Sequence, residues 1–322
     1  MNSGLKTTFL IIGYLIIILS GFMIIPHIVE MTIGDKSQHF LVTGILSAFI
    51  GTLLVLISQT KDRSLNVQQA FLMTNLAWLS ICFFGAIPLY FSSLDLTFTD
   101  AFFESVSGIT TTGSTILPDI ERASKGILVW RSLLQWLGGI GIIVMAITIL
   151  PLLNIGGMQL FRSEGMEVEK VVPKVTEIAL SITKIYIFIT ILCSLAYWLA
   201  GMNVFDSINH ALTTVSTGGY STHSQSIGYF NSSLIEVVAI IFIITGSVPF
   251  LAYIKFTRGD LFVFFKDKQI IGFFLILVGS ILIITVHSYV NRSDALILAL
   301  RDAAFNVTSI ITGTGYTTKD FS

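Results

Sequence analysis

Seven stretches of this sequence are both predominantly apolar and free of charged residues. They are Phe9–Ile28, Phe40–Ser58, Phe71–Tyr90, Ser132–Leu153, Ile185–Leu199, Val237–Ile254 and Ile270–His287. A helix needs about 20 apolar residues to cross a bilayer, and these runs are close to that length. The fifth is short, but Lys184 at its edge can extend it by snorkelling. The sequence therefore predicts an all-α polytopic membrane protein that is embedded in a lipid bilayer.

Composition narrows the function classes further. The chain is 53% hydrophobic and 11% charged, whereas soluble domains carry roughly a quarter charged residues. These values argue against a soluble enzyme and against a disordered or fibrous protein. The net charge of -1 gives no reason to expect a nucleic-acid partner. No nucleophile–base arrangement, phosphate loop or metal-ligand spacing occurs, so we expect neither an enzyme nor a cofactor.

Lysine and arginine residues between the runs predict the orientation. With the N-terminus in the cytoplasm, cytoplasmic segments hold ten of these residues and external segments hold six. The turn Lys255–Gln269 carries four of the ten. Positive residues are enriched on the cytoplasmic side of membrane proteins. We therefore expect a multi-pass protein with a cytoplasmic N-terminus.

Three polar segments between the runs share one pattern, which begins at an aspartate. They are Asp100–Thr115, Asp206–Ser221 and Asp302–Thr317. With +n denoting the nth residue after that aspartate, each has a glycine at +13 and hydroxyl residues at +10 and +15. The segments recur about every 100 residues, a longer period than that of solenoid repeats. The pattern predicts an internal repeat of span, polar segment and span.

The first part of each segment predicts a half-helix. About ten residues span roughly 15 Å, half of a bilayer, so the segment is expected to enter the membrane and return. The three aspartates are expected to be N-caps. The +4 residues, Glu104, His210 and Asn306, have two readings, as contacts at an external mouth or as structural hydrogen-bond partners.

The second part of each segment is a Thr/Gly strand. Irregular backbone at membrane depth is tolerated only where it is buried in protein or lines water. Such a strand can present successive carbonyls to a cation in place of its hydration shell. Glycine permits the positive φ or close approach that this requires, and the half-helix adds the negative end of its dipole. The segments therefore predict a cation-selective pore.

These strings resemble those of the Trk/Ktr/HKT superfamily of potassium transporters. They are TTTGST at Thr110–Thr115, STGGYST at Ser216–Thr222 and TGTGYTT at Thr312–Thr318. The run Trp130–Ile147 resembles the second helix of the first repeat in the TrkH-type membrane subunit. The runs Phe9–Ile28 and Phe40–Ser58 resemble its extra N-terminal helix pair. The resemblance covers essentially the whole chain.

The resemblance implies a filter built from backbone carbonyls. Members of the superfamily fold four span–pore helix–span repeats around a central pore that binds K⁺ as the transported ion. By position, the carbonyls would come from Thr111, Thr112, Thr217, Gly218, Gly313 and Thr314. The strands would be shaped by Gly113, Gly219 and Gly315. The implied partners are a second copy of the chain and a cytoplasmic, nucleotide-binding, TrkA-like regulatory subunit.

The resemblance also implies an organisation of the chain. Residues 1–65 would form the helix pair, 66–165 the first repeat, 166–265 the second and 266–322 the third. The third repeat is incomplete and the fourth is absent, which suggests a truncated member with one side of its filter missing. The expected function is potassium uptake across a bacterial inner membrane. The alternatives are a sodium-permeant relative and a non-conducting truncated membrane subunit.

Three further residues lie at marked places in the runs. Arg131 and Glu236 stand at the ends of runs, where a charge either marks a functional site or snorkels to the interface. Pro249 lies within the sixth run and is expected to kink its helix.

Overall fold

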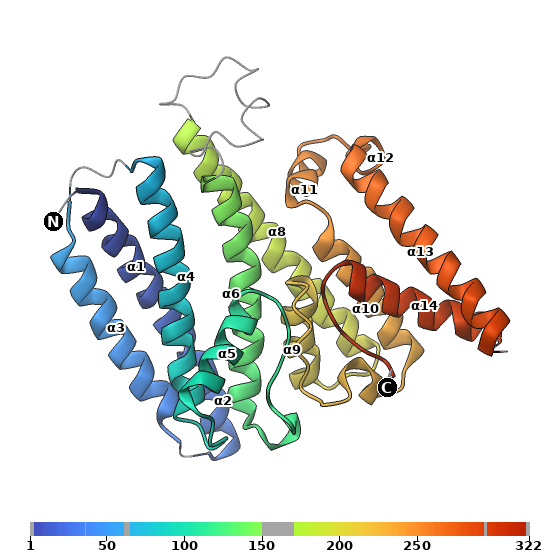
Figure 1. Ribbon diagram of the computed structural model, residues 1–322, viewed down its shortest axis with the longest axis horizontal. Helices are drawn as coiled ribbons and strands as arrows, with labels where there is room; N and C mark the ends of the chain where they lie inside the picture. Colours follow the sequence, from blue (N-terminus) through green and yellow to red (C-terminus); the bar gives the residue numbers. More distant parts are fainter. Residues whose placement is uncertain (1–2, 36, 61–64, 150–170, 293–294, 320–322) are drawn as a thin grey trace. The chain divides into compact units, whose positions relative to one another are not determined.

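The computed structural model describes residues 3–35, 37–60, 65–149, 171–292 and 295–319 (Figure 1). These residues contain helices and connecting loops and no strand. The chain divides into two compact units. The first comprises residues 1–110, 114–137 and 142–165, and the second comprises 111–113, 138–141 and 166–322.

The first unit begins with the helix pair. Helices α1 (Ser3–Phe22) and α2 (Ile24–Ile33) together form one apolar span, and α3 (His39–Ile57) forms the next. A Cβ atom added to Gly13 would lie 2.8 Å from the carbonyl oxygen of Gly51, and one on Gly51 would lie 2.9 Å from that of Gly13. Paired glycines thus let the two backbones touch, as in other membrane helix pairs.

The rest of the first unit holds one half-helix between two long helices. Helix α4 (Val67–Tyr90) is followed by α5 (Phe98–Ile109), the short η1 (Ile120–Arg122) and α6 (Lys125–Ile149). The indole nitrogen of Trp130 donates to the carbonyl of Gly85 at 2.9 Å, which joins α6 to α4. Figure 1 shows α1, α3 and α4 side by side.

The second unit repeats the arrangement and extends it. Its elements in order are α8 (Val171–Leu199), α9 (Val204–Val215), η3 (Ser226–Phe230), α10 (Ser233–Ser247), α11 (Phe250–Thr257), α12 (Val263–Lys266), α13 (Lys268–Arg292) and α14 (Leu296–Ile311). Helix α9 packs against α8 and α10, and α14 packs against α10 and α13. Helices α9 and α14 therefore each lie between two apolar helices, with α10 as their common neighbour.

Five of the seven expected spans are confirmed in the part of the chain that the structure describes. They are Gly4–Ile33, His39–Ile57, Gln68–Tyr90, Glu177–Leu199 and Lys268–Val290. The expected span Ser132–Leu153 coincides with α6 as far as Ile149, and its last residues lie outside the described residues.

The expected kink at Pro249 in the run Val237–Ile254 has the right position but is wrong in degree, because the chain breaks there into two separate helices. Helices α10 and α11 meet at 87°, because Val248 is extended, with φ −71° and ψ 136°, and Pro249 starts a new helix as its N-cap. A proline disfavours helical backbone in the residue before it and has no N–H to donate. The result is a broken helix rather than a kinked one.

The predicted aspartate N-caps are also wrong. Helix α5 is capped by Thr97, and α9 is capped by Asn203. Asp100 and Asp206 lie three residues later, and Asp100 completes a capping box with Thr97. The good cap three residues upstream moves each helix start. In the third segment α14 starts at Leu296, so Asp302 lies inside the helix.

Candidate functional site

The loops after α5, α9 and α14 share one backbone conformation. Each helix ends one residue before +10, at Ile109, Val215 and Ile311. Residue +11 then has positive φ, which is 55° at Thr111, 52° at Thr217 and 77° at Gly313. Residue +13 has positive φ again, which is 79° at Gly113, 76° at Gly219 and 78° at Gly315. The three loops therefore repeat in conformation as well as in sequence.

This alternation controls where the carbonyls point. In a β-strand, successive residues face opposite sides. Two left-handed residues with one residue between them turn the peptide plane twice, which lets neighbouring carbonyls share one side of the chain. An ion pathway lined by backbone oxygens needs that geometry. The expected positive φ of the +13 glycines is confirmed at all three positions.

Sequence reasoning missed the left-handed residues at +11. Thr111 and Thr217 are β-branched, and positive φ is a genuine outlier for such residues. Strained backbone of this kind costs on the order of 1–3 kcal/mol and persists only where its surroundings determine it. Gly313 at the same position of the third loop was a signal that could have revealed this conformation.

The second and third loops touch each other within the second unit. A Cβ atom added to Gly219 would lie 1.7 Å from the carbonyl oxygen of Thr314, so the two backbones approach more closely than any side chain permits. The hydroxyl of Tyr316 lies 2.6 Å from that of Thr213 and donates to the carbonyl of His210 at 3.2 Å. The structure therefore holds these two predicted filter strings together by backbone contact and by a buried tyrosine.

Hydrogen bonds inside each loop fold it back on its half-helix. The amide of Gly218 donates to the carbonyl of Thr213 at 2.9 Å, and that of Gly315 donates to the carbonyl of Ser309 at 3.2 Å. The hydroxyl at +7 also donates to the carbonyl at +14 in two of the loops. These bonds are Ser107 to Ser114 at 2.6 Å and Ser309 to Tyr316 at 2.7 Å. The loops are thus fixed by local bonds.

In the first loop a buried ion pair holds the end of the loop in place. Glu104 accepts hydrogen bonds from the hydroxyl of Thr115 at 2.9 Å and from the amide of Ile116 at 3.2 Å. Its carboxylate also pairs with the guanidinium of Arg131 on α6 at 2.7 Å. Glu104 and Arg131 are both at most 1% exposed. Of the two readings of Arg131, snorkelling is wrong, since its guanidinium is buried against a carboxylate.

In the second loop, hydrogen bonds of an uncharged histidine hold the equivalent position. His210 donates from Nδ1 to the carbonyl of Asp206 at 2.8 Å, so Nε2 accepts from the hydroxyl of Ser221 at 3.0 Å. Burial lowers the pKa of His210 to about 4. The imidazole is therefore uncharged at neutral pH. The +4 residues thus act as structural partners in the first two loops.

Asp206 ties the same loop to the residues beyond it. It accepts hydrogen bonds from Thr222 at 2.6 Å, from Asn203 at 2.7 Å and from Nε2 of His223 at 3.1 Å. Although burial opposes it, the hydrogen bonds from Thr222 and His223 hold the pKa of Asp206 below its ordinary value. The carboxylate is thus stabilised as a structural acceptor.

Two further contacts hold the half-helices in place. Glu236 on α10 binds Arg301 on α14 through two bonds of 2.6 Å each, so this buried glutamate is part of an ion pair. A Cβ atom added to Gly246 on α10 would lie 2.6 Å from the carbonyl oxygen of Val215.

Among the described residues no group of three His, Cys, Asp or Glu side chains could hold a metal ion.

Comparison with known proteins relates the chain to membrane transporters. The sequence model of the family described as "TrkH: Cation transport protein" matches residues 36–322. The chain is 38% identical over 317 residues to the Trk system potassium uptake protein TrkI of Halomonas elongata, covering 97% of this chain and 64% of that protein. It is 38% identical over 322 residues to TrkH of Escherichia coli K12, covering 97% and 66%.

A solved structure gives the same result for the fold. The crystal structure of the potassium transporter TrkH from Vibrio parahaemolyticus matches with a TM-score of 0.89 and 32% identity. The match covers 98% of this chain and 66% of that one. The chain therefore spans just under two thirds of the length of these relatives.

Proposed function

The chain belongs to the TrkH family of cation transport proteins, and we propose that it forms a potassium uptake pathway across a bacterial inner membrane. One observation carries the proposal, namely that three loops far apart in the sequence repeat positive φ at +11 and +13. The names of its relatives, which are potassium uptake proteins, support the choice of ion.

The coordinating groups in this proposal are backbone carbonyls. They belong to Thr111, Thr112, Thr217, Gly218, Gly313 and Thr314, while Gly113, Gly219 and Gly315 shape the loops. A K⁺ ion that sheds its water needs a set of oxygens already held in place, so that no reorganisation opposes entry. The hydrogen bonds from +13 or +12 to the +7 carbonyl supply that rigidity in the second and third loops.

The half-helices contribute electrostatically. Helices α5, α9 and α14 end at the loops, and each C-terminus carries roughly half a negative elementary charge. Three such ends favour a cation without placing a side-chain carboxylate beside it. Conduction needs binding that is favourable enough for the ion to enter and weak enough for it to leave, and partial charges of this size suit that balance.

The proposed organisation follows the repeats. Residues 1–65 form the helix pair, 66–165 the first repeat, 166–265 the second, and 266–322 belong to the third. The distribution of lysine and arginine supports a cytoplasmic N-terminus. By the family assignment, we further propose that the protein works as a homodimer with a TrkA-like regulatory subunit on its cytoplasmic side.

The test is rubidium and sodium uptake in cells that lack other potassium uptake systems, with the protein expressed from its own gene. We expect Gly219→Ala to abolish selective uptake, since the added Cβ would collide with the carbonyl of Thr314 at a residue with φ of 76°. Gly272→Ala is the matched control, because nothing lies within 4 Å of a Cβ atom there.

Each result has a clear meaning. Loss of the rubidium preference in Gly219→Ala with normal uptake in Gly272→Ala supports the filter assignment. An unchanged ratio of rubidium to sodium in Gly219→Ala contradicts it. Sodium uptake as fast as rubidium uptake by the unmodified protein would favour the sodium-permeant alternative.

A further inference from the structure

The turn between α11 and α13 is an ordered structure with one covered face. Val248, Ala252, Val263 and Ile270 form a buried apolar cluster, against which Tyr253 and Phe264 pack. The hydroxyl of Tyr253 donates to the carbonyl of Thr245 at 2.7 Å, which ties α11 back to α10 across the break. We call residues 255–268 the basic turn, and this packing fixes its conformation.

The other face of the basic turn is apolar and exposed. Phe265 is 78% exposed, Phe262 is 64% exposed and Leu261 is 61% exposed. These side chains belong to a turn whose inner face already has a core, so they are not needed for its folding. Large exposed apolar groups on an ordered segment mark an interaction surface.

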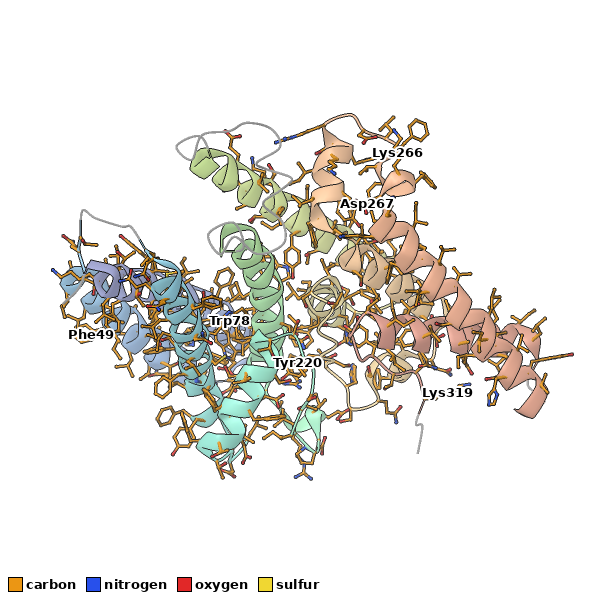
Figure 2. The ribbon with its side chains drawn as sticks, turned by 45° about the horizontal axis from the view of Figure 1, so that its top comes forward. Phe49, Trp78, Tyr220, Lys266, Asp267 and Lys319 are labelled. Atoms are coloured by element: carbon orange, nitrogen blue, oxygen red, sulfur yellow. The ribbon has the colours of Figure 1, made fainter. Side chains whose placement is uncertain are left out.

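The same turn carries a cluster of cations. Lys255, Arg258, Lys266 and Lys268 are all exposed. Lys266 lies 3.8 Å from Asp260 and 5.7 Å from the centre of the Phe262 ring. Figure 2 shows Lys266 and Asp267 at the junction of α12 and α13. Asp260 and Asp267 are the acidic residues of the turn, so the basic turn has a net charge of about +2.

The place of the turn in the fold identifies the surface that it meets. It leads directly into α13, whose residues Lys268–Val290 form an apolar span. A segment at the end of a span lies at the membrane surface, where aromatic rings settle among the headgroups and cations attract anionic lipids. The adjacent bilayer can bury the three exposed apolar side chains of the turn, so no soluble protein partner is needed to cover them.

We propose that the basic turn is a binding site for anionic phospholipid. Phe262, Phe265 and Leu261 enter the headgroup and upper acyl region, and the four cations bind the phosphate groups around them. The positive charge of the turn complements the negative charge of the lipid headgroups, and the aromatic side chains of the turn insert below those headgroups. This inference needs only the membrane location of the protein, and it stands apart from the filter assignment.

The test places a fluorescent label on the turn and a quencher on the lipid. Phe265→Cys is labelled with bimane, since Cys82 and Cys193 are buried. The protein is reconstituted in phosphatidylcholine vesicles that contain an equal share of either brominated phosphatidylglycerol or brominated phosphatidylcholine. We expect quenching by both lipids, and several times more by the anionic one.

Variants and salt then separate charge from shape. A quadruple variant should be quenched equally by the two lipids, since each cation near an anionic surface raises the affinity for that surface about fivefold. It combines Lys255→Gln, Arg258→Gln, Lys266→Gln and Lys268→Gln. Replacing the three lysines with arginine should keep the preference. High salt applied to the unmodified turn should weaken it even if the quadruple variant fails to fold.

Two results would overturn the proposal. Equal quenching by the two brominated lipids in the unmodified turn would show lipid contact without recognition of charge. No quenching by either lipid, with access of aqueous iodide to the label, would show that the apolar face meets water and suits a soluble partner.

Discussion

The first and second repeats fasten the same position with different chemistry. In both, the side chain at +4 binds the hydroxyl at +15, but the first repeat uses Glu104 and the second uses His210. The glutamate brings a buried arginine with it, Arg131 on α6. The histidine is neutral and needs only a backbone carbonyl and a hydroxyl. The repeat thus fixes the geometry of the loop and leaves open how it is held.

The largest expected effect comes from breaking the ion pair of Glu104 and Arg131, which we call the charged fastening; the hydrogen bonds of His210 are the neutral fastening. Glu104→Ala leaves the guanidinium of Arg131 buried without this carboxylate, and breaking a buried ion pair costs about 3–5 kcal/mol. It also removes the acceptor for Thr115 and for the amide of Ile116. We expect a large loss of thermal stability in detergent, together with loss of selective rubidium uptake.

Glu121→Ala is the control for this prediction, since Glu121 is an exposed acidic residue of the same repeat. A surface change of this kind is expected to alter stability by about 0.5 kcal/mol or less. Equal melting temperatures for Glu104→Ala and the unmodified protein would show that the ion pair does not hold the loop.

A smaller loss is expected in the neutral fastening. His210→Ala removes the acceptor for Ser221 and the donor to the carbonyl of Asp206, and a buried polar group left without its partner costs about 1–3 kcal/mol. His287→Ala, at an exposed position on α13, is the control. If His210→Ala costs more stability than Glu104→Ala, the comparison between charged and neutral fastenings fails.

The two fastenings also differ in their response to acid. The pKa of His210 in the folded protein is about 4, below its ordinary value of 6.5. The unfolded chain therefore binds the proton more readily, and stability falls as the pH is lowered from 6.5 towards 4. Asp206 affects stability only at lower pH. Its ionised carboxylate stabilises the folded protein above its ordinary pKa of 3.8, and this contribution is lost only as the pH falls below that value.

Melting temperatures between pH 7 and pH 4.5 test this response. His210→Asn keeps an amide that can donate and accept but does not titrate near these values. We expect the melting temperature of the unmodified protein to fall more steeply with acid than that of His210→Asn. Parallel curves would assign the acid sensitivity to other groups.

The smallest expected effect concerns the backbone at +11. Thr217→Gly places in the second loop the residue that the third loop already has as Gly313, and φ is positive at both positions. Relief of strain of about 1–3 kcal/mol opposes the greater freedom of glycine in the unfolded chain, which costs about 0.5–1 kcal/mol. We expect nearly unchanged stability and rubidium selectivity. A large loss of selectivity would instead assign coordination to the threonine side chain.

The sequence revealed the repeats because their features are local. Five spans and the left-handed +13 glycines follow from hydropathy and from glycine at one offset. At Pro249 the sequence predicts a kink and the structure has a break, because the sequence marks a proline but not how far the chain turns there. The helix starts were misplaced since Thr97 and Asn203 compete as caps with the aspartates that follow them.

Contacts between residues far apart in the chain could not be predicted from the sequence. The bond between Glu104 and Arg131 joins two helices, and the approach of Gly219 to Thr314 joins two repeats. Each depends on how the elements pack, which no spacing in the sequence encodes. The shared +4 position was the one usable signal for these contacts, and it favoured a structural partner over a residue at an external mouth without naming the partner. The left-handed threonines at +11 carried no residue signal in their own loops.

The most direct test of the filter assignment compares Gly113→Ala with Thr112→Ala in the first loop. Gly113 has φ of 79°, a conformation that costs an L-residue roughly 1–2 kcal/mol, whereas Thr112→Ala keeps its carbonyl. The measurement is the ratio of rubidium to sodium uptake in cells that lack other potassium uptake systems. We expect a lower ratio for Gly113→Ala and a nearly unchanged ratio for Thr112→Ala. The reverse order would show that side-chain hydroxyls, rather than backbone carbonyls, select the ion.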